Sequence, residues 1–332
     1  MTQLPTGNTI EKAVLLAGRA PSLHNSQPWH WEFDGRALRL FSVPERMLPA
    51  TDTSGQQLLI SCGIALDHLR VAMAAAGWHT HVDRFPNPNR RDHLATLTFH
   101  PSEAVTDGDR DRADAIMRRR TDRLPFTAPT GWSDFESILR ATVNPADVAL
   151  DVLPEGSRPT LARAAEMAAA LRRYDSEYHA ELQWWTGHTI ASAGVPKEAL
   201  ISPEEGRQVA INRQFPAAKD IPPRSESTTD HAVILVLSTD SDTPGDLVSC
   251  GEALSTVLLE CTLAEFATCT LTHLIEVPRS RAVIRELTEH SGLPQVMVRV
   301  GITSAADQDT PPTPRRPLAE ILDMSAPAEH AQ

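Results

Sequence analysis

The run Arg19-Ala-Pro-Ser-Leu-His-Asn-Ser-Gln-Pro-Trp-His-Trp31 restricts the fold of this chain more than any other stretch. Its two prolines fix their own φ angles and bias the residue before each toward extended backbone, so a preceding helix must stop here. Ser22, Asn25 and Gln27 carry groups that both donate and accept hydrogen bonds. Such a rigid, polar loop could hold a flat ligand with polar edges, or it could be a well-packed turn between a helix and a strand.

The length of 332 residues exceeds the usual single core of about 100 to 200 residues, which indicates two domains or one double-sized core. A hydrophobic content of 41% can fill such a core. The net charge of -12 and the pI near 5.5 argue against a nucleic-acid or anionic-membrane partner, because either would be repelled at long range.

The cysteines form no CxxC pair and stand in mostly apolar runs, at Cys62, Cys250, Cys261 and Cys269. We expect buried free thiols in a reducing cytosol rather than disulfides or a zinc site. The chain starts with no signal sequence, and no run approaches the roughly 18 apolar residues that span a bilayer, so the expected location is cytoplasmic. His79 and His81 share one face of a strand, but no carboxylate stands at ligand spacing, so no metal site is expected.

Hydrophobic periodicity and turn residues predict an α+β fold. The expected helices cover 8–20, 55–76, 106–123, 134–141, 158–185, 245–266 and 282–289, with a last amphipathic turn over 318–322. The expected strands cover 29–33, 37–41, 78–85, 93–100, 148–153, 231–237 and 295–301, the first two joined by an Asp-Gly turn. The segment 193–229 is rich in proline, glycine, serine and charge, which is typical of a disordered segment or a lid.

One pattern occurs twice. Asp52-Thr-Ser-Gly55 precedes Leu59-Ile-Ser-Cys-Gly-Ile-Ala-Leu66, and Asp242-Thr-Pro-Gly245 precedes Leu247-Val-Ser-Cys-Gly-Glu-Ala-Leu254. Small residues at the same place in two apolar helices allow their backbones to approach closely, as at a pseudo-two-fold axis. The repetition indicates two fused halves in one chain; the alternative is a chance match between two alanine- and leucine-rich helices.

The segment Ala20-Pro21-Ser22-x-x-Asn25-x-Gln27-Pro28-Trp29-x-Trp31 resembles the APSxxNxQPWxF signature of the FMN-dependent nitroreductase family. The closer resemblance is to the dormancy-associated, Acg-type nitroreductase-like proteins of actinobacteria, and it runs nearly the full length of the chain. Its markers lie at 19–29, 118–123, 178–182 with Trp184-Trp185, and 313–317. The resemblance implies a nitroreductase-like fold and an FMN cofactor.

The resemblance also implies the residues that contact FMN. Arg119-x-Thr121-x-Arg123 resembles the RxSxR phosphate clamp, and Arg315-Arg316 resembles a basic pair that reaches the same phosphate. A solvated basic helix end is the alternative for the clamp. The loop over the flavin ring is expected around Thr270, Leu271 and Thr272, for which a plain threonine-rich strand is the alternative. The signature loop is expected to contact the ring through Ser22, His24, Asn25, Gln27, Pro28 and Trp29.

The signature occurs only in the first half of the chain and the clamp only in the second. We therefore expect one FMN per chain, held between a half at 1–105 and a half at 106–332. The fusion buries the surface that a homodimer would use, so a monomer is expected.

In the family, NAD(P)H reduces FMN, and the electrons pass to a nitroaromatic or quinone-type acceptor. The cofactor carries this chemistry, so no catalytic side chain is expected. The chain has no GxSxG, GxGxxG, Walker or HExxH motif. The alternative is a non-catalytic protein that sequesters FMN beneath a lid at 193–229. An unrelated structural protein would bind no flavin at all.

Overall fold

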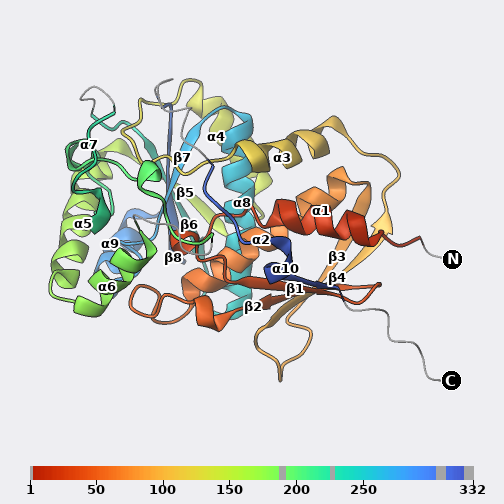
Figure 1. The fold of residues 1–332 in the computed structure, drawn as a ribbon. Helices are drawn as coiled ribbons and strands as arrows, with labels where there is room; N and C mark the ends of the chain where they lie inside the picture. The colour runs from red at the N-terminus through yellow and green to blue at the C-terminus, as the bar shows by residue number, and fades with distance from the viewer. Residues whose placement is uncertain (1–2, 187–191, 225–228, 304–311, 325–332) are drawn as a thin grey trace.

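The computed structural model describes residues 3–186, 192–224, 229–303 and 312–324. Two β-sheets flank a central pair of long helices, with further helices on the outer faces (Figure 1). Helices and strands mix along the whole chain, which confirms the α+β class that the sequence predicts.

The first sheet has the strand order β3-β4-β2-β1-β9 and the second the order β5-β6-β8-β7. The second sheet is antiparallel throughout. The strands are β1 (Trp29–Phe33), β2 (Leu38–Ser42), β3 (Trp78–Arg84), β4 (His93–Pro101), β5 (Ala149–Leu153), β6 (Val233–Thr239), β7 (Ala267–Leu271), β8 (Leu293–Gly301) and β9 (Leu322–Met324).

The end of the described chain returns to the first sheet. β9 pairs in parallel with β1, with Leu322 opposite Trp31. The sequence predicts only a helical turn over 318–322. The strand that follows is too short to show an alternating pattern, and its partner lies at the other end of the chain. This return places the tail at 312–317 beside the signature loop (Figure 1).

The described helices match most of the predicted ones, but the sequence predicts no helix over 203–208, extends the helix over 106–123 five residues too far and joins two helices over 158–185. They are α1 (Gly7–Ala17), α2 (Gln56–Ala75), α3 (Asp107–Arg118), α4 (Trp132–Thr142), α5 (Arg158–Arg172), α6 (Ser176–Trp185), α7 (Pro203–Gln208), α8 (Pro244–Leu263), α9 (Pro278–Leu287) and α10 (Leu318–Ile321). Short 3₁₀ turns cover Leu23–Asn25, Pro44–Arg46, Glu155–Ser157, Lys197–Ala199 and Pro216–Ala218.

The single helix predicted over 158–185 is wrong: α5 and α6 are separate. The Asp175 side chain accepts a hydrogen bond from the Tyr178 N–H at 3.0 Å and caps a new helix. An aspartate that bonds the backbone in this way competes with the continuation of the preceding helix.

α2 and α8 cross in direct backbone contact at the repeated glycine. A Cβ added at Gly63 would lie 2.2 Å from the Val248 carbonyl oxygen, and one added at Gly251 would lie 2.1 Å from that of Ile60. In the repeated pattern Gly63 corresponds to Gly251 and Ile60 to Val248. Exchanging the two copies therefore turns the contact between Gly63 and Val248 into the contact between Gly251 and Ile60. The close approach predicted from the small residues is therefore present, with a local two-fold relation at the crossing.

Replacing Gly63 with alanine is expected to destabilise the protein by about 1–3 kcal/mol, because two helix backbones must separate to admit the methyl group. Gly108→Ala in α3 is the matched control, since the nearest atom to its added Cβ is a side-chain oxygen 3.7 Å away. Thermal or urea unfolding measures both. Equal stability of the two variants would contradict the tight crossing.

The four cysteines are buried and free, as the sequence predicts. The expectation that no run approaches a membrane span is wrong for one helix. Among the described residues, α2 is long and apolar enough, with a mean hydropathy of 1.5 over its best window, but 72% of that window is buried inside the protein. Its hydrophobicity is that of a helix at the centre of the core.

Candidate functional site

A cavity lies against the first turns of α2, with walls from both halves of the chain. Its space is about 770 Å³, counting the part that opens to solvent. Three of the predicted segments meet there, represented by Ser22, His24, Thr121, Arg123, Thr270, Leu271 and Thr272. The wall is completed by Pro21, Leu23, Gln57, Ile60, Ser61, Ile64, Asn212, Arg213, Phe215, Leu254, Cys269, His273 and Val296.

The signature loop has a strained backbone. His24, Asn25 and Gln27 have φ angles of 47°, 59° and 49°, in the left-handed region that favours glycine. Each such residue costs on the order of 1 kcal/mol or more, and such strain concentrates at ligand-binding sites. The surrounding contacts must hold this conformation.

Two amide side chains of the signature loop supply those contacts. Asn25 Nδ2 donates to the carbonyl oxygens of Gly194 and Pro314 at 3.0 and 3.1 Å. Gln27 Nε2 donates to the Ser192 carbonyl oxygen at 2.9 Å. Neither residue lines the cavity. In this structure both amides hold the loop against neighbouring segments.

Pro28 and Trp29 of the signature do not line the cavity. Trp29 is fully buried in the main hydrophobic core. The Pro28 carbonyl oxygen accepts hydrogen bonds from the Val43 N–H at 2.9 Å and from Cys62 Sγ at 3.2 Å. Pro28 and Trp29 therefore anchor the loop between the first strand and α2.

The predicted clamp divides between two places. Thr121 and Arg123 line the cavity, and the Asp122 N–H donates to the Thr268 carbonyl oxygen at 2.9 Å, which ties the clamp to the start of β7. Arg123 Nη1 donates to the Ala199 carbonyl oxygen at 2.9 Å.

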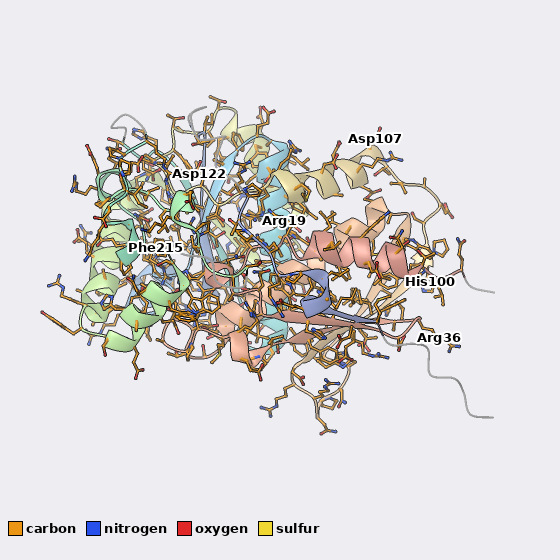
Figure 2. The ribbon with its side chains drawn as sticks, viewed as in Figure 1. Arg19, Arg36, His100, Asp107, Asp122 and Phe215 are labelled. Carbon is orange, nitrogen blue, oxygen red and sulfur yellow. The ribbon has the colours of Figure 1, made fainter. Side chains whose placement is uncertain are left out.

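Arg119 instead lies with Arg19 and Arg315, and we call these three residues the arginine cluster. Arg19 Nη1 and Arg315 Nη1 both donate to the Thr313 carbonyl oxygen, at 3.3 and 3.1 Å. Arg315 also donates to the carbonyl oxygens of Gly18 and Arg19, at 3.0 and 3.1 Å. Figure 2 shows Arg19 near the middle of the molecule.

Positive charge in the arginine cluster is not compensated by a carboxylate of the described chain. Burial, followed by the charge of Arg19, lowers the pKa of Arg119 to about 10. Burial, followed by Arg19 and Arg119, lowers the pKa of Arg315 to about 9. No carboxylate of the described chain contributes to either shift, and the Nε atoms of Arg19 and Arg119 are buried without a hydrogen-bond partner.

Arg316 lies outside the arginine cluster. Its N–H donates to Gln27 Oε1 at 2.8 Å, and its Nη1 lies 3.4 Å from the carbonyl oxygens of Gln27 and Trp29. Its Nε pairs with Glu320 at 3.2 Å. Arg316 thus attaches the tail to the signature loop.

Arg213 comes from the segment that the sequence leaves without structure. Its Nη1 donates to the Tyr178 hydroxyl at 3.0 Å, and its Nη2 donates to Thr272 Oγ1 at 3.1 Å and pairs with Glu276. Thr272 Oγ1 in turn donates to Glu276 at 2.7 Å. The end of β7 and this segment are therefore joined by a compensated, buried ion pair.

Two histidines on the cavity wall are held neutral. Burial, followed by the charge of Arg213, lowers the pKa of His24 and of His273 well below the ordinary value. His24 Nε2 and both ring nitrogens of His273 are buried without partners. These nitrogens are available to hydrogen-bond a ligand.

The described part of the segment 193–229 is ordered and contributes to the cavity wall. Ser202 and Glu205 form a capping box at the start of α7. Phe215 packs edge-on against His24, with ring centroids 5.8 Å apart. Figure 2 shows Phe215 on the side of the molecule that carries the second sheet. Residues 225–228 of the predicted lid lie outside the described residues.

Sequence reasoning did not single out the residues that the central helices contribute. Gln57, Ser61 and Ile64 recur at helical spacing on α2 and line the cavity. Polar residues one turn apart on an otherwise apolar helix are a signal that could have identified this face. His273, Arg213 and the cluster member Arg19 carry no such periodic signal.

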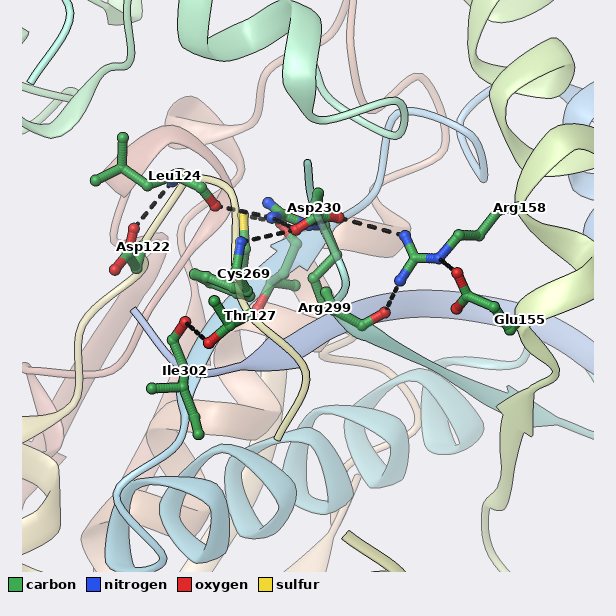
Figure 3. Close-up of polar contacts among 12 residues, drawn as sticks. Asp122, Leu124, Thr127, Glu155, Arg158, Asp230, Cys269, Arg299 and Ile302 are labelled. Atoms are coloured by element: carbon green, nitrogen blue, oxygen red, sulfur yellow. Dashed lines mark hydrogen bonds and ion pairs between the residues drawn. The ribbon is translucent and has the colours of Figure 1, made fainter. Parts of the chain in front are cut away.

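A buried ion-pair network fixes the chain just after the clamp (Figure 3). Asp230 accepts from Arg299 Nη2 at 2.5 Å, from Arg158 Nη1 at 3.4 Å and from the Phe126 N–H at 2.9 Å. Arg299 Nη2 also donates to the Leu124 carbonyl oxygen at 2.8 Å. The clamp is thereby attached at its far end to β8.

His79 and His81, the pair weighed for metal binding, are both exposed on β3. Within the ranges that the structure describes, no group of three or more histidine, cysteine, aspartate or glutamate residues could hold a metal ion.

No family model matches the chain. It is similar to two Mycobacterium tuberculosis H37Rv proteins. "Putative NAD(P)H nitroreductase acg" is 48% identical over 321 residues, 97% of each chain. "Uncharacterized protein Rv3127" is 49% identical over 319 residues, 95% of this chain and 93% of that one. Among solved structures, the FMN-dependent nitroreductase NfnB from Mycobacterium smegmatis in complex with NADPH is 16% identical, with a TM-score of 0.41, over 66% of this chain and 100% of that one.

Proposed function

The chain belongs to the nitroreductase family, in the Acg-type group, and from this premise we propose that it is an FMN-binding oxidoreductase. It takes reducing equivalents from NAD(P)H and passes them to a nitroaromatic or quinone-type acceptor. The relative acg carries the name of a nitroreductase. Neither relative described above is named as a flavin-storage protein, so the sequestering alternative has no support there.

The arginine cluster is the observation that carries this proposal. Arg119 is buried, Arg19 and Arg315 are half-buried, and the charge of Arg19 lowers the pKa of both of the others. With no carboxylate of the described chain contributing to these shifts, such a group of guanidinium ions costs free energy unless an anion joins it. The phosphate of FMN supplies that anion with oxygens that can accept several charge-assisted hydrogen bonds. Arg19 joins the predicted Arg119 and Arg315 in this role, whereas Arg316 is engaged by the signature loop.

The cavity and the arginine cluster follow one another along α2. Gln57, Ser61 and Ile64 line the cavity, and His68, farther along the same side of the helix, is within electrostatic range of Arg119 and Arg315. Ser61 and His68 are separated by roughly 10 Å along the axis, at about 1.5 Å per residue. A ribityl chain between ring and phosphate suits this arrangement, with the ring in the cavity.

FMN, when bound, supplies the chemistry of accepting a hydride and passing on electrons. The protein binds and orients it. Thr121 and Thr270 offer hydroxyl groups to the polar edges of the ring, and His24 and His273 offer neutral imidazole nitrogens. Thr272 lines the same wall, with its hydroxyl held by Arg213 and Glu276. No described side chain needs to act as an acid or base in this proposal.

A second cavity, lined by parts of α2 and α8 together with β3, α3 and the end of α4, argues for one FMN per chain. Ser249 lines it as Ser61 lines the first, but Glu252 takes the place of Ile64. Glu252 is 8% exposed and is paired with Arg70 at 3.2 Å and Arg84 at 2.7 Å. This network fills the equivalent position with charge, which disfavours an isoalloxazine ring.

We further place the protein in the cytoplasm as a monomer, with a half at 1–105 and a half at 106–332. The central helix contact, which a homodimer would form between subunits, is made within one chain. β9 is the part of the second half that returns to the first sheet.

The purified protein is expected to be yellow, to contain about one flavin per polypeptide, and to lose its flavin absorbance when NADPH is added without oxygen. Anaerobic spectroscopy followed by acid extraction and quantification of the flavin checks this. Two FMN per chain would contradict the single site. Bleaching by dithionite but by neither NADH nor NADPH would contradict the oxidoreductase, and a colourless protein that rejects added FMN would contradict both.

A further inference from the structure

A small apolar cluster brings four polar residues together at the centre of the molecule. The last turn of α3 packs against α8, α2 and the end of α1 through Ala115, Ile116, Leu259, Leu16 and Val71. One helical turn from these contacts, or three to four residues along the chain, stand Arg19, His68, Arg119 and Ser255. His68 and Ser255 are 2.8 Å apart, the charge of Arg119 acts on His68, and that of Arg19 acts on Arg119, so the four share one neighbourhood.

His68 is the unusual member of this group. It is fully buried on α2, and its Nδ1 lies 2.8 Å from Ser255 Oγ on α8. Its Nε2 is buried without any hydrogen-bond partner. A buried polar atom that lacks a partner costs about 1–3 kcal/mol, so such atoms are rare unless a ligand satisfies them.

His68 also continues the face of α2 that lines the cavity. Ser61, Ile64 and His68 follow one another at intervals of three and four residues, so their side chains share one side of the helix. Ser61 and Ile64 line the cavity, and His68 follows about one turn farther along the helix. Burial, followed by the charges of Arg119 and Arg315, lowers the pKa of His68 well below its ordinary value, against a smaller opposing effect of a hydrogen bond to the Ile64 backbone.

We infer that His68 is a further ligand of the flavin phosphate, donating a hydrogen bond from Nε2 while Ser255 orients the ring through Nδ1. This inference rests on the proposed FMN site. The Ser255 hydroxyl also reaches Asp67, and its hydrogen can rotate between Asp67 and His68. A phosphate beside the arginine cluster selects the arrangement in which Ser255 donates to Nδ1 and the imidazole hydrogen resides on Nε2.

The test compares FMN with riboflavin, which has the same ring and ribityl chain but no phosphate. His68→Asn can retain the contact to Ser255 but presents no donor at the position of Nε2. His68→Gln places an amide nitrogen near that position. We expect His68→Asn to weaken FMN binding by about tenfold or more while changing riboflavin binding by less than about threefold, and His68→Gln to recover part of the FMN affinity.

Ser255→Ala provides a second variant that leaves the imidazole in place and frees its orientation. Ser255→Ala is expected to weaken FMN binding less than His68→Asn does, and to leave riboflavin binding unchanged. The ³¹P resonance of bound FMN provides a readout beside affinity and is expected to shift in His68→Asn. It is measured on the full-length protein reconstituted with FMN.

The outcomes separate this inference from the proposed function. Equal weakening of FMN and riboflavin by His68→Asn, or no weakening of either, would overturn the role of His68. Should His68→Asn not fold, unchanged FMN affinity and an unchanged ³¹P resonance in Ser255→Ala would overturn it. Failure of the wild-type protein to bind FMN would overturn the proposed function first and this inference with it.

Discussion

Arg119→Met is expected to weaken FMN binding by about 100-fold or more, because it removes a buried cation from the site that receives the phosphate. Riboflavin affinity is expected to change by less than about threefold. Arg118→Met is the matched control, since Arg118 is the preceding residue and is exposed at the end of α3. Fluorescence titration of each apoprotein measures the affinity of Arg119→Met for FMN and for riboflavin, and that of Arg118→Met for FMN.

Although Arg119→Met should weaken FMN binding, it is not expected to destabilise the apoprotein. Burial and the neighbouring Arg19 hold the pKa of Arg119 at about 10, so the charged form is disfavoured in the folded state. That penalty applies at any pH below about 10 and is relieved as the pH rises through this value. At pH 7, Arg119→Met should therefore leave the melting temperature of the apoprotein unchanged or higher. A lower melting temperature with unchanged FMN affinity would contradict the anion site.

Asp230→Ala is expected to reduce the free energy of unfolding by about 3–5 kcal/mol, the usual cost of removing one partner from a buried ion pair. Asp230 and Arg299 are 4% and 1% exposed, and the loss leaves the Arg299 guanidinium uncompensated in the core. FMN binding should weaken as well, because Asp230 also accepts from the Phe126 N–H just after the clamp. Denaturant unfolding measures the first effect.

Glu155→Gln is the control for this prediction. Glu155 pairs with Arg158 at 2.6 Å, but its side chain is 72% exposed, so the change should cost less than about 1 kcal/mol. If both variants reduced the free energy of unfolding equally, burial would not determine how much each ion pair in Figure 3 stabilises the protein.

The regular elements were predictable because periodicity along the chain reports which face is buried. Both hairpins of the first sheet and both central helices appear close to their predicted bounds. The break before α6 was not predictable from periodicity, because it depends on the Asp175 side chain bonding the backbone. β9 was not predictable either, since its pairing joins residues at opposite ends of the chain.

The candidate site likewise has features that local patterns predict and features that depend on contacts between distant segments. Motif spacing brought Thr121, Arg123 and Thr270 to one cavity, because each motif lies on a short segment beside a strand or helix end. It did not reveal that Asn25 and Gln27 hold the loop through backbone carbonyls. The arginine cluster and His68 are assembled by the packing of α1, α2, α3 and the tail, which no local pattern encodes.

The crossing of α2 and α8 belongs to a single polypeptide, and this has a consequence for how the molecule can change. In an association of identical subunits every mutation appears twice, at both symmetry-related positions. Here Ile64 and Glu252 occupy corresponding positions and differ, so each has been free to drift alone. Dilution cannot separate the two helices either, and the stability gained at their contact should be independent of protein concentration.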